Sequence, residues 1–166
     1  MPVLRIVTHI AAPVERCFDL ARSIDLHSRS TQQTAERAVA GVTTGLIGAG
    51  EEVTWRARHF GVWQTLTSRI TVCDRPRHFR DVQVRGIFAR LEHDHYFQPA
   101  GLDGTRMTDV FDYSAPLGPL GRLAERAFLS AYLRRFLEER NAVVASVAAS
   151  TDEWRRYLAP AEGTNP

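Results

Sequence analysis

The sequence contains no lysine, and all 21 of its basic residues are arginine. These arginines are dispersed among 19 acidic residues, which leaves a net charge of only +2. Proteins that bind nucleic acids usually gather their basic residues in patches or blocks. The dispersion therefore argues against a nucleic-acid partner, and we expect none.

Cysteine is also scarce, since Cys17 and Cys73 are the only two in the chain. Their separation does not match the short spacing of cysteine pairs that bind metals. We expect both to be reduced, packed thiols in a reducing compartment.

Long hydrophobic runs are absent as well. No run reaches the roughly 20 apolar residues that a membrane-spanning helix needs, and the start of the chain lacks a signal-peptide pattern. We therefore expect no membrane span and a cytoplasmic location. The 166 residues, 44% of them hydrophobic, suit a single domain over 1–158 with a flexible C-terminal tail at 159–166.

Alternating apolar and polar residues, rich in β-branched and aromatic types, predict several strands separated by short turns. Consecutive strands joined by short turns favour an antiparallel meander. The predicted strands are Val3–Ile10, Glu36–Val42, Glu51–Phe60, Val62–Asp74, Phe79–Arg85, Arg90–Gln98 and Arg106–Tyr113.

Helical periodicity appears in three places. A short amphipathic helix follows Pro13, and a second short helix is expected between Ser23 and Gln33. A long helix is predicted from Arg122 to about Ala149, after a hinge at 118–121, with a new helix start signalled by 150–153. The whole pattern predicts an α+β fold, in which a curved antiparallel sheet of six to seven strands wraps around the long C-terminal helix.

Polar residues lie on strand faces that we expect to point inward. Period two places His93 and His95 on the same face as Leu91 and Phe97. The matching face of the next strand carries Met107, Asp109, Phe111 and Tyr113, and one strand earlier Phe79 brings Asp81 and Gln83 with it.

Two interpretations of this polar set remain open. In the first, Asp109 or Asp81 orients His93 or His95 as an acid/base pair, and Tyr113 contributes to catalysis. In the second, the same residues form a buried hydrogen-bond network that holds the sheet together or recognises a polar part of a ligand.

A metal site is the less favoured alternative. His93 and His95 lie two residues apart, and His27 and His59 are expected near the same pocket, but no His-x-x-x-His or Cys-x-x-Cys spacing is present. We therefore predict no metal and no other cofactor.

Several short motifs accompany this order of elements. They are Phe18-Asp19-Leu20, Gly50-Glu51-Glu52-Val53-Thr54-Trp55, Asp74-Arg75-Pro76, His93-Asp94-His95 and Gly104-Thr105-Arg106-Met107-Thr108-Asp109. The chain resembles the helix-grip superfamily of START-related and polyketide cyclase/dehydrase-like domains, SRPBCC, and within it a bacterial branch loosely labelled as cyclases or cell-division-related proteins. The resemblance implies a cavity between sheet and long helix that holds a hydrophobic small molecule.

The first functional hypothesis is binding, transport or sensing of a lipid, isoprenoid, quinone or polyketide-like compound in that cavity. The second is a cyclase, aromatase or dehydratase that uses the pocket His and Asp residues. A protein-interaction module on the outer surface ranks last. We also consider that the chain forms a homodimer. The expected ligand-binding residues are Trp55, His59, Phe79, Asp81, Gln83, His93, His95, Phe97, Met107, Asp109, Phe111, Tyr113, Phe128, Tyr132 and Phe136.

Overall fold

The computed structural model describes residues 2–158, so the tail predicted at 159–166 lies outside the described residues. Seven strands form one antiparallel sheet in the order β1-β7-β6-β5-β4-β3-β2. The strands are β1 (Val3–Ile10), β2 (Arg37–Gly41), β3 (Glu52–His59), β4 (Val62–Asp74), β5 (His78–Arg85), β6 (Arg90–Ala100) and β7 (Gly104–Ser114). The predicted meander is confirmed, because β2 to β7 follow one another across the sheet.

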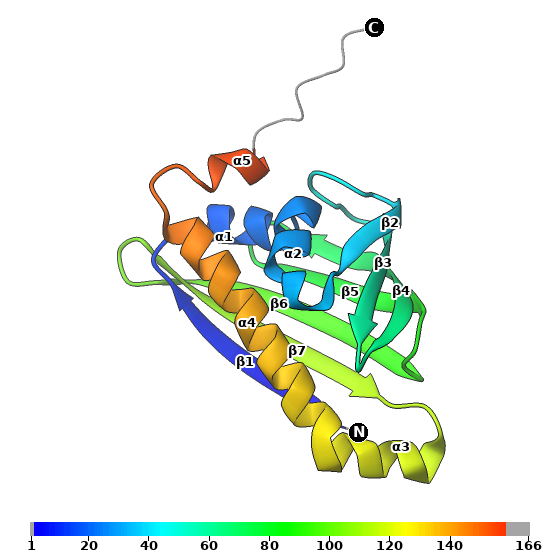
Figure 1. Cartoon of the computed structure of the whole chain (residues 1–166). Coiled ribbons are helices and arrows are strands. Elements are labelled where there is room, and N and C mark those ends of the chain that lie inside the picture. Colours follow the sequence, from blue (N-terminus) through cyan, green and yellow to red (C-terminus); the bar gives the residue numbers. More distant parts are fainter. Residues whose placement is uncertain (1, 159–166) are drawn as a thin grey trace, which may run out of the picture.

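The helices pack against the curved sheet, with α4 (Ser130–Ala149) running diagonally across it and α1 (Val14–Ala21) and α2 (Ile24–Ser30) covering one end (Figure 1). A 3-10 turn, η1 (Gln32–Thr34), leads into β2, and α5 (Arg155–Leu158) follows α4. This arrangement confirms the predicted helix-grip fold, with two short helices after the first strand.

The main core lies where α1 meets the sheet. Cys17 and Phe18 are completely buried, and the Phe18 ring meets Phe79 and Phe97 edge-on at centroid distances of 5.5 and 5.4 Å. Edge-to-face aromatic pairs add to the free energy of burying apolar area. Cys17 is thus a packed thiol, as expected.

The start of the C-terminal helix differs from the prediction. The residues predicted as a hinge form the first turns of α3 (Gly118–Ala124), because proline is tolerated in a first turn and Pro119 occupies one. A β-carbon on Gly121 would lie 2.0 Å from the carbonyl oxygen of Pro116, so the turn approaches the preceding chain where only glycine fits. The helix therefore begins at Gly118 rather than at Arg122.

A π-helical turn, η2 (Glu125–Leu129), separates α3 from α4, and the two helices point in different directions (Figure 1). Such a turn contains an extra residue and rotates the helix faces on its two sides relative to each other. One apolar stripe therefore does not continue along the whole predicted helix, since Leu123 and Phe128 are exposed whereas Leu133 and Leu137 are buried. The predicted new helix start is confirmed, because the Ser150 hydroxyl accepts a hydrogen bond from the Trp154 amide ahead of α5.

One outer-face residue also departs from expectation. Period two places Asp94 on the outer face of β6, where a solvated charge is expected, but only 8% of it is exposed. Its carboxylate accepts hydrogen bonds from Arg80 at 2.7 and 3.0 Å, and one of its oxygens lies 2.6 Å from Nε2 of His78. Arg80 and His78 thus cover the Asp94 carboxylate. The His78 ring is in turn stacked on Tyr96.

Candidate functional site

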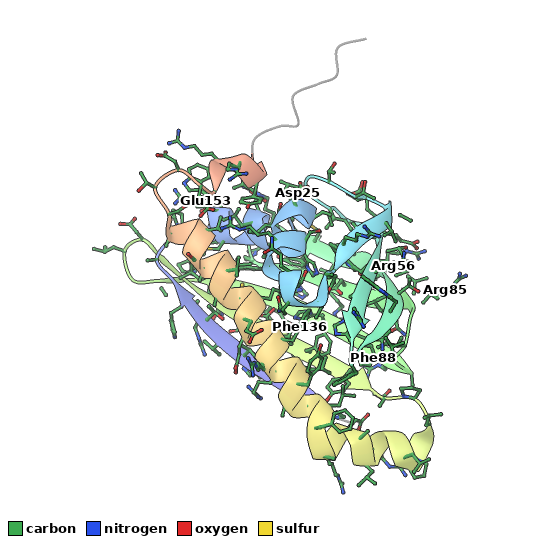
Figure 2. All side chains as sticks on the ribbon, viewed as in Figure 1. Asp25, Arg56, Arg85, Phe88, Phe136 and Glu153 are labelled. Carbon is green, nitrogen blue, oxygen red and sulfur yellow. The ribbon has the colours of Figure 1, made fainter. Side chains whose placement is uncertain are left out.

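A cavity of about 180 Å³ lies between the concave face of the sheet and α4. Phe136 of α4 lines it from the helix side, and Phe88, in the turn between β5 and β6, lines it from the sheet side (Figure 2). Most of the wall is apolar, but it also includes carboxylate, imidazole and guanidinium groups, among them Asp81, His93, His95 and Arg140. This combination of an apolar pocket with a few convergent polar groups is typical of a small-molecule site.

Nine of the fifteen residues expected to bind a ligand line this cavity. They are Trp55, His59, Phe79, Asp81, His93, His95, Phe111, Tyr132 and Phe136. They come from β3, β5, β6, β7 and α4, so the helix-grip arrangement brings together residues that are far apart in the sequence. Their binding roles remain predictions.

The other six lie elsewhere. Phe97 and Met107 are buried in the core beside α1, and Gln83 bonds to the backbone of Phe88 through its side-chain amide. Asp109 lies behind the histidines, and Phe128 contacts Phe60 at the surface.

The last of the six, Tyr113, is completely buried, with its hydroxyl 2.8 Å from that of Ser130. This contact joins β7 to the first residue of α4. None of the six contributes to the cavity wall, so each would act on a ligand only through a neighbouring side chain.

Two histidines and two aspartates form a cluster, which we call the His–Asp cluster: Asp81, His93, His95 and Asp109. Oδ1 of Asp109 lies 2.9 Å from Nε2 of His93 and 2.8 Å from Nδ1 of His95, the latter off the ideal donor direction. Oδ1 of Asp81 lies 3.2 Å from Nε2 of His95 and 3.8 Å from Nδ1 of His93. Asp109 is completely buried, whereas Asp81 and both histidines reach the cavity.

The sheet register accounts for this cluster. His93 pairs with Asp81 on β5, and His95 pairs with Asp109 on β7. Because side chains two residues apart share a face, both imidazoles stand side by side with ring centroids 3.8 Å apart. The central position of β6 places one carboxylate on each side of them.

Two residues of α4 complete the surroundings of Asp109. The Asn141 amide donates a 2.6 Å hydrogen bond to Oδ2 of Asp109 and lies 3.3 Å from the Thr8 hydroxyl. Nη1 of Arg140 lies 3.7 Å from Oδ1 of Asp109, and its Nε is buried without a hydrogen-bond partner within residues 2–158. Since Arg140 also lines the cavity, this guanidinium is placed to receive a polar group of a ligand.

Sequence reasoning missed Arg140 and Asn141. The signal was present, because both interrupt the buried row formed by Leu133, Leu137 and Val144 at helical spacing. A charged residue and an amide within a buried helix face indicate a polar partner on the facing element.

The pKa values in the cluster shift in different directions. Burial would raise the pKa of Asp109, but hydrogen bonds from His93 and His95 hold it well below its usual value. Burial and the neighbouring His95 lower the pKa of His93. Burial acts in the same sense on His95, but contacts with Asp109 and Asp81 outweigh it and raise its pKa. The environment therefore favours the proton on His95 over His93.

One edge of the cavity lining is formed by the exposed Phe60, in the turn between β3 and β4, and by Tyr132 near the start of α4. Nδ1 of His59 lies 2.6 Å from the Tyr132 hydroxyl, and the Phe60 ring lies 4.6 Å from the Tyr132 ring. Phe60 has a φ of +50° and Gly61 a φ of +79°, the positive values that a two-residue hairpin turn requires. A bulky residue rarely adopts such a backbone, so the exposed Phe60 is an exceptional choice there.

The described residues also include a group able to hold a metal. One ligand atom from each of Asp81, His93 and His95 lies within 4.8 Å of the others. Two imidazoles and a carboxylate are common ligands of zinc and other divalent transition metals.

Comparison with known proteins assigns the chain to a family. Residues 1–149 match the family described as polyketide cyclase/dehydrase and lipid transport. The chain belongs to this family. Membership agrees with the START-related and cyclase-like resemblance read from the motifs, and it covers the entire sheet and α4. No functionally curated protein matches the chain in sequence.

Solved structures share the fold of this family member. A protein from Thermus thermophilus is 23% identical, with a TM-score of 0.74, and the match covers 90% of this chain and 100% of that one. The Zhui aromatase/cyclase from a Streptomyces species is 18% identical over 95% and 96% of the two chains, with a TM-score of 0.60. Ginseng major latex-like protein 151 from Panax ginseng is 15% identical over 90% and 98%, with a TM-score of 0.65. At these identities the likeness establishes the fold alone.

In residues 2–158 no helix combines the length and the apolar character needed to cross a membrane. The family and the fold support a domain that binds hydrophobic ligands.

Proposed function

We propose that this protein binds a compact hydrophobic molecule in the cavity between the sheet and α4, as a carrier or sensor. The main support is the cavity itself, whose wall is largely apolar and includes the polar side chains of Asp81, His93, His95 and Arg140. An apolar wall gains free energy from excluding water, and the polar groups fix the orientation of the ligand.

The cavity volume limits the ligand. About 180 Å³ is smaller than the roughly 300–1,000 Å³ of sites that enclose drug-sized molecules. It is close to the roughly 150 Å³ of an apolar cavity that accommodates benzene. The enclosed part is therefore one aromatic ring or a short stretch of acyl or isoprenoid chain, and a longer ligand would leave the cavity beside Phe60.

The polar region defines the other end of the ligand. The buried Nε of Arg140 has no hydrogen-bond partner among the described residues, and Arg140 is one of the residues that line the cavity. A buried donor without a partner costs about 1–3 kcal/mol, which a ligand oxygen would recover. We expect a carbonyl, phenol or carboxylate oxygen at this end, as in a quinone, a polyketide-like compound or a fatty acid.

Native mass spectrometry of protein purified from its own host tests the proposal. The test variant is Ala57→Phe, which adds a phenyl ring to the cavity from β3. The control is Arg56→Phe, which places the same ring on the exposed face of that strand. We expect a co-purifying apolar ligand on the wild type and on the control, and its loss from Ala57→Phe. Equal occupancy in both folded variants, or no bound ligand on the wild type, would contradict the proposal.

A second candidate is an enzyme of the cyclase, aromatase or dehydratase type, favoured by the contact of His93 and His95 with the cavity. An imidazole beside a buried carboxylate is suited to proton transfer. Replacing His93, His95 or Asp109 by Ala would abolish turnover of a polyketide-like substrate in an enzyme. In a carrier the same changes would reduce affinity in a graded way.

A further inference from the structure

We propose that Asp81, His93 and His95 form a site for a divalent transition-metal ion, with an open position that faces the cavity. The three side chains supply one carboxylate oxygen and two imidazole nitrogens within 4.8 Å of one another. Three protein ligands with a fourth position left open are the arrangement of catalytic zinc sites. The inference goes beyond the binding of an apolar molecule and does not depend on that ligand.

The distances around Asp81 are compatible with such a site. A tetrahedral centre with bonds of about 2.0 Å separates its ligand atoms by about 3.3 Å. Oδ1 of Asp81 lies 3.2 and 3.8 Å from the nearest nitrogens of His95 and His93. Both distances are close to this separation. Without an ion, the 3.2 Å contact of His95 with Asp81 is a hydrogen bond, which an ion bound between the two side chains would replace.

Asp109 orients the imidazole of His93. Its Oδ1 lies 2.9 Å from Nε2 of His93, so it accepts the N–H of that ring in its neutral form. Nδ1 of His93 then carries the lone pair and faces Asp81, and Nε2 of His95 faces the same carboxylate. In metal sites a carboxylate behind a histidine fixes the tautomer and the ring orientation in this way.

The charges are compatible with a divalent cation. Asp81 and Asp109 contribute two negative charges and Arg140 one positive charge, so the site carries a net charge of about −1 when both rings are neutral. A divalent cation changes this to about +1. The open position would therefore favour an anionic or strongly polarised oxygen, the same chemistry that Arg140 favours.

The donors select the kind of ion. Imidazole nitrogen with one carboxylate suits zinc, iron or manganese in the divalent state better than calcium or magnesium, which prefer oxygen ligands. Zn²⁺ is the reference probe because it tolerates a three-ligand site with an open position.

Isothermal titration calorimetry of the chelator-treated full chain with Zn²⁺ tests the site. With Co²⁺ in place of Zn²⁺, visible absorption bands report tetrahedral coordination. We expect one ion per chain on the wild type. Asp81→Asn and His95→Gln should each weaken binding at least 100-fold, and Asp109→Asn, which removes only the orienting group, about 10–100-fold.

The control is the double variant His9→Gln/His78→Gln, which removes two histidines outside the cavity and should leave the affinity unchanged. Thermal unfolding monitored by circular dichroism establishes that each variant is folded. Binding that is lost in the double variant, that persists in Asp81→Asn and His95→Gln, or that fails to reach one ion per chain would overturn the proposal. None of these outcomes affects the binding of an apolar ligand measured with Ala57→Phe.

Discussion

Asn141 holds the carboxylate at the centre of the His–Asp cluster. Only 1% of this residue is exposed, and its amide donates a 2.6 Å hydrogen bond to Asp109. Replacing Asn141 by Ala leaves a buried oxygen without its donor, which costs about 1–3 kcal/mol of the free energy of unfolding. Denaturation in urea measures this loss.

A double-mutant cycle assigns the loss to the contact itself. If the Asn141–Asp109 hydrogen bond is responsible, Asn141→Ala should cost less in an Asp109→Asn background, with a coupling energy of about 0.5–3 kcal/mol. Strict additivity of the two changes would show that the cost comes from the lost volume of the Asn141 side chain instead.

Residue types alone predicted much of the cluster, and the reason is geometric. Period two placed His93, His95 and Asp109 on inward faces, and all three are buried. The same rule could not separate a residue that lines the cavity from one behind it, because that depends on where α4 lies. Asp109 and Met107 face inward yet stay outside the cavity wall.

At the scale of elements, an ion-pair network joins α1 to the turn between β4 and β5. The carboxylate of Asp19 accepts a hydrogen bond from Nη2 of Arg22 at 2.9 Å and one from Nη2 of Arg75 at 2.8 Å. Burial would raise the pKa of Asp19, but these two arginines outweigh burial and lower it. The network links two of the motifs noted in the sequence, Phe18-Asp19-Leu20 and Asp74-Arg75-Pro76.

The lowered pKa of Asp19 predicts a pH-dependent contribution to stability. A carboxyl group whose pKa is lower in the folded than in the unfolded state stabilises the fold above its unfolded pKa of about 4 and loses this effect as the pH falls through the folded pKa. Asp19→Asn should therefore lower the free energy of unfolding by about 1 kcal/mol at neutral pH, and the deficit should shrink below about pH 4.

Urea denaturation of both proteins across this pH range measures the deficit. Asp103→Asn, in the exposed turn between β6 and β7, is the control for loss of one negative charge. A deficit of Asp19→Asn that persists unchanged in acid, or one that Asp103→Asn reproduces, would contradict the role given to the network.

The predicted elements were accurate where the alternation of apolar and polar residues and the turn-forming residues indicate the same boundaries, as in the strands from β3 to β7. The helix start was wrong because Gly118 and Pro119 usually interrupt helices, whereas here they occupy a first turn. The π-helical turn at Glu125–Leu129 has no pattern of its own in the sequence. It arises where the Glu125 carboxylate accepts a 2.6 Å hydrogen bond from the Ala115 amide and so holds the chain ahead of α3.

At the scale of the whole molecule, the fold places one cavity wall on a single long helix. α4 is anchored along its length by Leu133, Leu137, Val144 and Val147, all buried. On the side of β3 it meets the sheet through His59 and Phe60. The wall is therefore firmly packed on one side and closed by aromatic contacts on the other.

This asymmetry has a kinetic consequence. A ligand that enters beside Phe60 must separate its ring from Tyr132, so the contact acts as an energy barrier on the route rather than as part of the bound state. Phe60→Ala should accelerate both association and dissociation of an apolar fluorophore such as anilinonaphthalene sulfonate, each about 10-fold, with little change in the dissociation constant. Stopped-flow fluorescence measures both rates.

Val62→Ala, an equally exposed position of the same hairpin, is the matched control and should leave both rates unchanged. A change in the dissociation rate alone would instead place Phe60 in contact with the bound ligand. If both rates change together, the strained turn at Phe60 sets how long a ligand stays, independently of how tightly the cavity holds it.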